Sequence, residues 1–166
     1  SKKMRILGID PGFAIVGWGV LDYEGNHFKT IAHGAITTPS GQNLFERFKK
    51  IYDDLTELIA QTKPDFMAIE ELFFNTNTTT AINVAQARGI IVLAAMNAGI
   101  NIYEYTPLQV KQAVAGYGRA EKQQVQQMVK MILNLEKIPK PDDTADALAI
   151  AICHGHSYRA NTPRWK

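Results

Sequence analysis

The sequence predicts an α/β protein built on a five-stranded mixed sheet flanked by helices, and three observations favour this fold. An apolar, strand-forming run ends on a carboxylate at residues 6–10 and is followed at once by a Pro-Gly turn. A second run of the same kind, residues 66–70, again ends on an acid. An amphipathic helical pattern, residues 44–59, lies between them, so a right-handed crossover would make the two strands parallel.

The length of 166 residues suits one domain with a single core. The composition, with 46% hydrophobic and 20% charged residues, is typical of a globular protein. We expect residues 1–158 to form this domain and residues 159–166 to be a basic C-terminal tail. The longest mostly apolar run, residues 89–100, is too short to cross a bilayer, and a signal peptide is not expected. The single Cys153 excludes an internal disulfide. A cytoplasmic location without membrane contact is therefore expected.

The opening strands are predicted to form an antiparallel meander. Strand-like runs at residues 15–21 and 27–37 follow the first strand, and Thr38-Pro39-Ser40-Gly41 ends the third. The helical pattern that comes next is stopped by Lys63-Pro64-Asp65. Its apolar face is expected to be core and nothing more.

The second half of the chain is predicted to consist of four helices and one strand. The expected elements are a helix over residues 81–98, a strand over 102–105, a short helix from Thr106-Pro107, a helix after the loop 116–122, and a last helix from Asp142. Arg88 is the only charged residue of the first of these helices, and we expect it to pair with an acid rather than with a phosphate. The Gly-x-Gly of the loop is no nucleotide fingerprint, because the third glycine and the preceding strand are absent.

Four carboxylates are expected to converge in this arrangement. Parallel strands bring Asp10 and Glu70 to the same edge of the sheet, where open α/β sheets bind ligands. Asp143 and Asp146 share one face of the first turn of an Ala-rich helix that suits close packing on a sheet. The alternatives are a turn-forming Asp10, a strand-end surface acid at Glu70, and helix capping by the two later acids.

Carboxylates packed together repel one another and take up protons unless a cation neutralises them. Their oxygens favour hard divalent ions, Mg²⁺ or Mn²⁺, which also bind phosphates. Two such ions about 3.5–4 Å apart can activate a water and stabilise the leaving oxygen in phosphodiester cleavage. No Cys-His set for zinc and no Ser-His-Asp set for acyl transfer stands out. The acids thus favour a metal-dependent enzyme acting on phosphodiesters, with two ions per active site.

Basic residues gather in the later part of the chain, although the net charge of +2 is too small to indicate a partner. Residues 108–140 hold two acids and six basic residues: Lys111, Arg119, Lys122, Lys130, Lys137 and Lys140. A basic face beside an acidic rim suits an enzyme that acts on a polyanion with metal ions. The alternative is a solvated helix face followed by a basic tail.

Several segments, in order along residues 4–157, resemble the bacterial RuvC family of Holliday-junction resolvases. They are Leu-Gly-Ile-Asp-Pro-Gly at 7–12, Ala-Ile-Glu at 68–70, Gln-Ala-Arg-Gly at 86–89, Val-Lys-Gln at 110–112, Glu-Lys at 121–122, and Asp-Thr-Ala-Asp-Ala-Leu-Ala-Ile-Ala at 143–151. The resemblance implies a ribonuclease-H-like fold. It also implies a metal-dependent endonuclease that makes symmetric paired nicks in four-way DNA junctions during recombination and repair, leaving 5′-phosphate and 3′-hydroxyl ends.

The resemblance further assigns roles to individual residues. It implies that the metal-binding and catalytic acids are Asp10, Glu70, Asp143 and Asp146. It places the DNA-binding residues at Phe73, Lys111 and Lys122, and the basic loop adds Arg119. Phe73 would stack on or wedge between bases where strands part, with a core role or its neighbour Phe74 as alternatives.

The family is a symmetric homodimer, which suits a junction with two equivalent strands to cut. Residues 81–98 are the candidate interface helix, with an internal core helix as the alternative. A branch-migration motor complex is a partner by resemblance. His154 and His156 are candidate general bases.

Three other functions fit parts of the pattern. An actin-like ATPase needs a second lobe that 166 residues cannot supply. A non-catalytic junction-binding module would not need all four acids. Another ribonuclease-H-like nuclease, acting on RNA hybrids or making single nicks, would differ in its preferred substrate.

Overall fold

The central strand β1 (Met4–Asp10) organises a five-stranded sheet in the computed structural model, which describes residues 2–72 and 78–158. The strand order is β3-β2-β1-β4-β5, and the other strands are β2 (Ile15–Glu24), β3 (His27–Thr37), β4 (Phe66–Glu70) and β5 (Asn101–Tyr105). β1 pairs antiparallel with β2 and parallel with β4, and β4 pairs parallel with β5. The predicted mixed sheet, with its opening meander and its parallel crossover strand, is confirmed.

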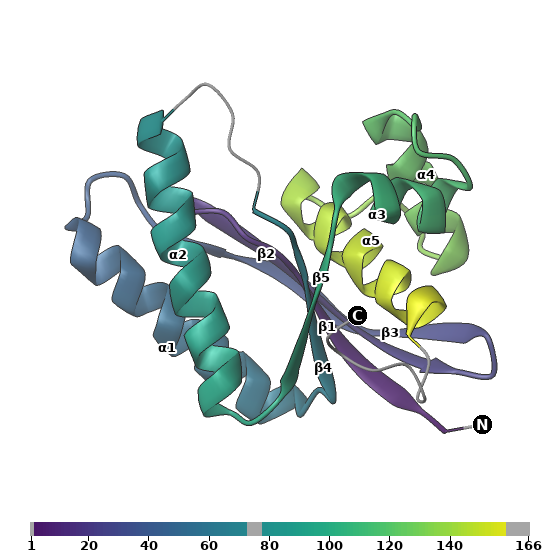
Figure 1. The fold of residues 1–166 in the computed structure, drawn as a ribbon, viewed down its shortest axis with the longest axis horizontal. Coiled ribbons are helices and arrows are strands. Elements are labelled where there is room, and N and C mark those ends of the chain that lie inside the picture. Colours follow the sequence, from purple (N-terminus) through teal and green to yellow (C-terminus); the bar gives the residue numbers. More distant parts are fainter. Residues whose placement is uncertain (1, 73–77, 159–166) are drawn as a thin grey trace.

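Helices cover both faces of this sheet (Figure 1). α1 (Leu44–Thr62) and α2 (Thr78–Asn97) lie on one face. α5 (Asp142–Ser157) lies on the other, with α3 (Pro107–Ala115) and α4 (Lys122–Ile132) packed against it. α2 begins three residues earlier than predicted, at Thr78 instead of residue 81. The part of the chain that the structure describes contains no helix long and apolar enough to cross a membrane.

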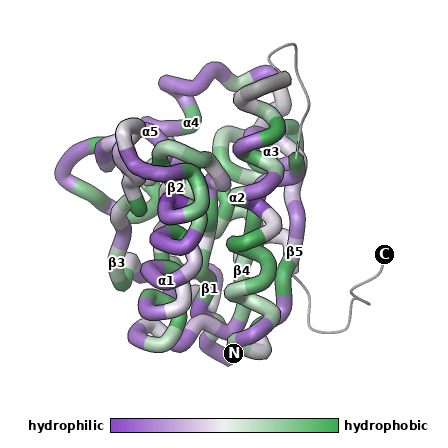
Figure 2. Tube along the Cα trace, turned by 90° about the vertical axis from the view of Figure 1, so that its left-hand side faces the viewer, coloured by the Kyte–Doolittle hydropathy of each residue, from purple (hydrophilic) through white to green (hydrophobic). Residues whose placement is uncertain are grey.

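β1 is buried on both faces, and it divides the core into two layers. Ile6 packs in the cluster shared with α3, α4 and α5, whereas Leu7 and Ile9 pack in the cluster shared with α1 and α2. Because successive side chains of a strand point to opposite faces, a strand covered on both sides needs an uninterrupted apolar run. Figure 2, viewed from the side of α1 and α2, shows hydrophilic residues along α1, whose apolar residues face the sheet.

Glycines let α5 approach the sheet more closely than side chains would allow. A Cβ atom added at Gly8 would collide with the carbonyl oxygen of Ala147, and one added at Gly17 would collide with that of Asp143. A side chain at Gly19 would strike Leu148. The first turns of α5 therefore rest directly on β1 and β2, which places the acids of that helix beside the end of β1.

Candidate active site

The four predicted acids lie at one edge of the sheet. Asp10 and Glu70 are the last residues of the parallel strands β1 and β4. Asp143 and Asp146 belong to the first turns of α5, which the glycine contacts hold against β1 and β2. The structure therefore brings together acids that are 136 positions apart in the sequence (Asp10 to Asp146).

The carboxyl groups interact strongly enough to alter their protonation. Burial, followed by repulsion from Asp146, Glu70 and Asp143, raises the pKa of Asp10 to about 8. Asp10 and Asp146 share a hydrogen bond, so at neutral pH one of these two groups keeps a proton. Burial and the nearby Asp146 also raise the pKa of Glu70, which Lys111 partly opposes. The cluster thus holds more negative charge than the protein neutralises.

The donor chemistry of this cluster fits a hard divalent cation. Carboxylate oxygens are the ligands that Mg²⁺ and Mn²⁺ prefer, and a cation would offset the burial and the repulsion that raise the pKa of Asp10. Within residues 2–72 and 78–158, no three His, Cys, Asp or Glu side chains stand in an arrangement that could hold an ion as they are. A divalent cation held by these oxygens would replace the proton that Asp10 and Asp146 share.

Two of the predicted basic residues lie beside the acids. A cavity of about 280 Å³ is lined by Glu70 and Asp146 together with Lys111 of α3 and Lys122 of α4. The Lys122 ammonium is 3.8 Å from Asp146 Oδ2, and this carboxylate is the main cause that raises the pKa of Lys122. A pocket lined by both carboxylates and ammonium groups can hold a phosphate close to bound cations.

Short helices place these two lysines. The Thr106 side chain caps α3 directly after β5, with Pro107 at the first helical position as predicted. α4 begins at Lys122, so its ammonium extends from the start of the helix towards the start of α5. Arg119 is exposed on the segment between α3 and α4, outside this cavity. Phe73 and Phe74 lie outside the described residues.

Arg88 contacts the backbone that carries one of the four acids. Its guanidinium donates to the Glu104 carboxylate and to the backbone carbonyl oxygen of Glu70, the latter at 3.5 Å. The predicted pairing with an acid is confirmed. Because this contact joins α2 to the ends of β4 and β5, Arg88 helps to fix the backbone that carries Glu70.

The two histidines of α5 are remote from the acids. His154 is eleven residues after Asp143 on the same helix, about 16 Å along its axis. Its ring is fully buried, with Nδ1 hydrogen-bonded to the Tyr105 hydroxyl, and burial lowers its pKa to about 4. His156 packs against Tyr23 and Phe28 at the far end of β2 and β3. Neither histidine can act as the general base for chemistry at the acidic edge, so that candidate role is wrong.

Sequence reasoning did not single out Asp142 as a site residue. Its carboxylate lies 3.2 Å from the Lys140 ammonium and 3.6 Å from that of Lys122. The contact with Lys140 is the main cause that lowers the pKa of Asp142. The Lys122 contact depends on how α4 packs on α5, and no local sequence signal announces it.

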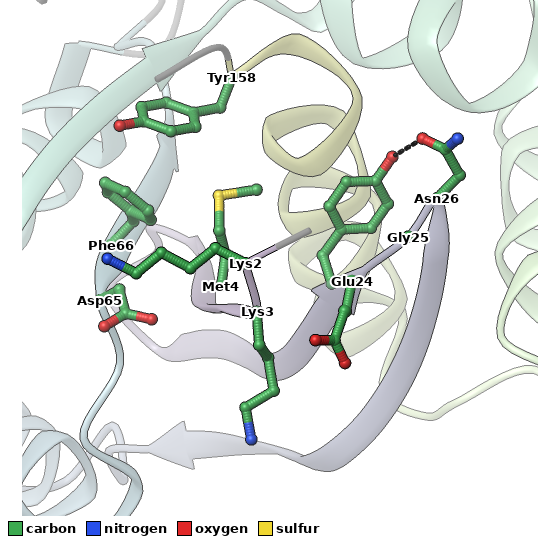
Figure 3. Close-up of a pocket in the computed structure, with 10 residues that line it drawn as sticks. Lys2, Lys3, Met4, Glu24, Gly25, Asn26, Asp65, Phe66 and Tyr158 are labelled. Atoms are coloured by element: carbon green, nitrogen blue, oxygen red, sulfur yellow. Dashed lines mark hydrogen bonds between the residues drawn. The ribbon is translucent and has the colours of Figure 1, made fainter. Parts of the chain in front are cut away.

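Figure 3 shows a second cavity, of about 530 Å³, which is remote from the four acids. Met4, Phe66 and Tyr158 contribute apolar surface, and Lys2, Lys3, Glu24 and Asp65 line it with charges of both signs. It opens at the start of β1 and β4, so the whole length of these strands separates it from Asp10 and Glu70. It has neither the acidic cluster nor the lysines of the first site.

Comparison with known proteins connects this geometry to one family. The family model described as "Crossover junction endodeoxyribonuclease RuvC" matches residues 6–154. A protein of that name from Alkaliphilus metalliredigens is 66% identical over 154 residues, which cover 93% of this chain and 94% of the relative. Its counterpart from Alkaliphilus oremlandii is 62% identical, with the same coverage.

Solved structures agree with these relatives. Thermus thermophilus RuvC, at 38% identity, superposes with a TM-score of 0.86 over 92% of this chain and 94% of its own. The same protein in complex with a Holliday junction substrate gives a TM-score of 0.88 over 92% and 93%. The predicted ribonuclease-H-like fold is confirmed by these matches. The yeast mitochondrial Holliday junction resolvase Ydc2, at 14% identity and a TM-score of 0.63, shares the fold.

Proposed function

The chain belongs to the RuvC family and is a Holliday-junction resolvase, a metal-dependent nuclease, and we propose that Asp10, Glu70, Asp143 and Asp146 form its catalytic centre. The observation that carries this assignment is the gathering of these acids where β1, β4 and α5 meet, and there burial, followed by repulsion from the neighbouring carboxylates, raises the pKa of Asp10 to about 8. A protein surface gains nothing from crowding four carboxylates unless a cation or a reaction uses them.

The four carboxylates would hold Mg²⁺, or Mn²⁺ in its place, with two ions in each active site. When bound, such ions supply the positive charge that activates a water and stabilises the leaving 3′-oxygen of the scissile phosphodiester. The products are a 5′-phosphate and a 3′-hydroxyl, ready for ligation. The acids orient the ions, and their burial keeps the charges close and weakly screened.

Lys111 and Lys122 would contact the scissile phosphate. Both line the cavity of about 280 Å³ beside Glu70 and Asp146, where a DNA phosphate could meet ammonium groups and cations together. Arg119 is exposed in the segment between the helices that carry the two lysines, and it would bind the DNA backbone outside the cavity. Phe73 follows β4 in the chain, three residues after Glu70, and would contact the unstacked bases near the crossover.

A homodimer is proposed because α2 carries an apolar face that the fold leaves exposed. Ala87, Ile91, Ala94 and Ala95 are buried against the sheet. Ile82, Leu93 and Met96 are 57%, 51% and 61% exposed, and at helical spacing they share the opposite face. Gly89 lies on that face, and a Cβ added there would meet nothing within 4 Å. A two-fold axis through this face would present two equal sites to the two equivalent strands of a junction.

Residues 1–158 would act as one nuclease unit, and the tail 159–166 would add positive charge. From family membership alone, we also propose that the protein is cytoplasmic and cooperates with a branch-migration motor.

Substrate competition tests this function against the other nuclease and module alternatives. A labelled four-way junction is cut in Mg²⁺ while an unlabelled junction, a linear duplex or an RNA–DNA hybrid of equal length competes. We expect the unlabelled junction to compete best by a wide margin. Equal competition by linear duplex or hybrid would contradict the resolvase assignment, and junction binding without cutting would favour a binding module.

A further inference from the structure

The Lys122 ammonium lies between two carboxylates of the same helix. It is 3.6 Å from Asp142 Oδ2 and 3.8 Å from Asp146 Oδ2. Both separations are ion-pair distances of similar length, so the ammonium is shared between the two acids. Asp142 and Asp146 are one helical turn apart on α5, which allows one cation to face both.

We propose that Asp142 is a positioning residue that shares the Lys122 ammonium with Asp146 and thereby keeps Lys122 from occupying the Asp146 carboxylate. This inference rests on the proposed function, in which Asp146 must accept a divalent cation. An ammonium held by Asp146 alone would compete with that cation for the same oxygens. Asp142 instead keeps the ammonium beside the cavity of about 280 Å³, where it can contact a phosphate.

Stability alone does not account for this arrangement. The side chains of Asp142 and Lys122 are 46% and 56% exposed, and ion pairs exposed to that extent contribute little to the stability of a fold. Asp146 is less exposed, at 32%, and its carboxylate belongs to the acidic cluster. The same ammonium therefore matters more for the charge at the cluster than for the fold.

Lys140 pairs with the second oxygen of the Asp142 carboxylate. Its ammonium is 3.2 Å from Asp142 Oδ1, while Lys122 faces Oδ2 of the same carboxylate. Asp142 thus divides its charge between two lysines, and Lys122 divides its own between two acids. Because opposed attractions hold the Lys122 ammonium, removal of either acid moves it towards the other.

The test measures Mn²⁺ binding to the full chain by isothermal titration calorimetry, without DNA. We expect Asp142→Asn to weaken Mn²⁺ binding about two- to fivefold, the size of an exposed ion-pair effect. Asp142→Glu should restore most of the affinity, since it keeps the carboxylate. Asp54→Asn is the matched control, because Asp54 also pairs with an exposed lysine, Lys50, but on α1; it should leave Mn²⁺ affinity unchanged.

The same substitution in a Lys122→Met background decides how Asp142 acts. If Asp142 acts through Lys122, Asp142→Asn has no further effect on Mn²⁺ affinity once Lys122 is gone. An equal loss in both backgrounds would overturn the inference, because Asp142 would then attract the cation directly through its own field. No loss in either background would overturn it as well. If the unsubstituted protein failed to bind Mn²⁺, the proposed function would fail, and the inference with it.

Discussion

The carbonyl oxygen of Asp143 lies directly against the Cα of Gly17, so that no side chain fits between the start of α5 and β2. This contact, with those at Gly8 and Gly19, sets the distance between the helix acids and the strand acids. The arrangement of the four acids therefore depends on backbone packing between α5 and the sheet.

Gly17→Ala should destabilise the protein and impair cutting together. The added methyl group forces α5 away from β2, and overpacking of this kind costs about 1–3 kcal/mol. Denaturant unfolding measures the loss of stability, and junction cleavage measures the displacement of Asp143. Gly41→Ala is the control, because a Cβ there meets nothing within 4 Å; a comparable loss in this variant would show that the packing argument is wrong.

Asp10 should make the metal-free protein less stable at alkaline pH. Its folded-state pKa of about 8 exceeds the ordinary value of 3.8, so the folded protein binds a proton that the unfolded chain releases. Stability therefore falls as the pH rises from about 4 to 8. Asp10→Asn should raise the melting temperature at pH 8 without metal, by an amount equivalent to at least about 1 kcal/mol.

Added Mg²⁺ should make the unsubstituted protein more stable than Asp10→Asn at the same pH. The ion stabilises the unsubstituted protein by binding the folded state, and Asp10→Asn should gain much less. Equal stabilisation of both proteins by Mg²⁺ would place the metal elsewhere.

Asp22 should stabilise the fold without affecting catalysis. It is 7% exposed, and Arg5 donates two hydrogen bonds to it, at 2.8 and 3.0 Å. These bonds are the main cause that lowers the pKa of Asp22 below its ordinary value of 3.8. The ion pair therefore stabilises the fold fully above pH 3.8, and this contribution is lost as the pH falls through the folded-state pKa. Asp22→Asn should cost about 1–3 kcal/mol at pH 7 in denaturant unfolding, because it leaves Arg5 without its anion. A cost that persisted unchanged at pH 3 would contradict the ion-pair explanation.

If the exposed face of α2 forms the proposed homodimer interface, Leu93→Glu should convert the protein to a monomer without unfolding it. Leu93 is 51% exposed on the outer face of α2, where a charge is harmless in a monomer and costly inside an apolar interface. Sedimentation velocity measures the association state, and circular dichroism the fold. Met131→Glu is the control, since Met131 is 69% exposed on another helix. A Leu93→Glu protein that remained dimeric would exclude α2 as the interface.

Local patterns sufficed for the fold and for the position of the acids. The two apolar runs that end on Asp10 and Glu70, and the helical pattern between them, determine the parallel pair and hence the shared edge. Asp143 and Asp146 follow from the start of an Ala-rich helix. The resemblance of short segments in fixed order then pointed to one family, which the relatives confirm.

Local sequence patterns could not predict the side-chain contacts between elements that are distant in the sequence. The partners of Lys122 and Asp142 depend on the packing of α4 against α5, and these residues are 20 positions apart. The burial of His154 depends on Phe66, Tyr103 and Tyr158, which surround its ring. A single helix pattern cannot tell a histidine at an active edge from one enclosed by aromatic rings at the other end.

Cleavage of a synthetic four-way junction in Mg²⁺, comparing the unsubstituted protein with Asp10→Asn, tests the central claim most directly. Loss of supporting contacts around a metal already costs about 10–100-fold, so loss of a direct ligand should reduce cutting by more than about a hundredfold while junction binding persists. We expect symmetric paired nicks from the unsubstituted protein and none from the variant. Nicks of equal rate from both proteins would contradict the assignment of the acidic edge as the catalytic centre.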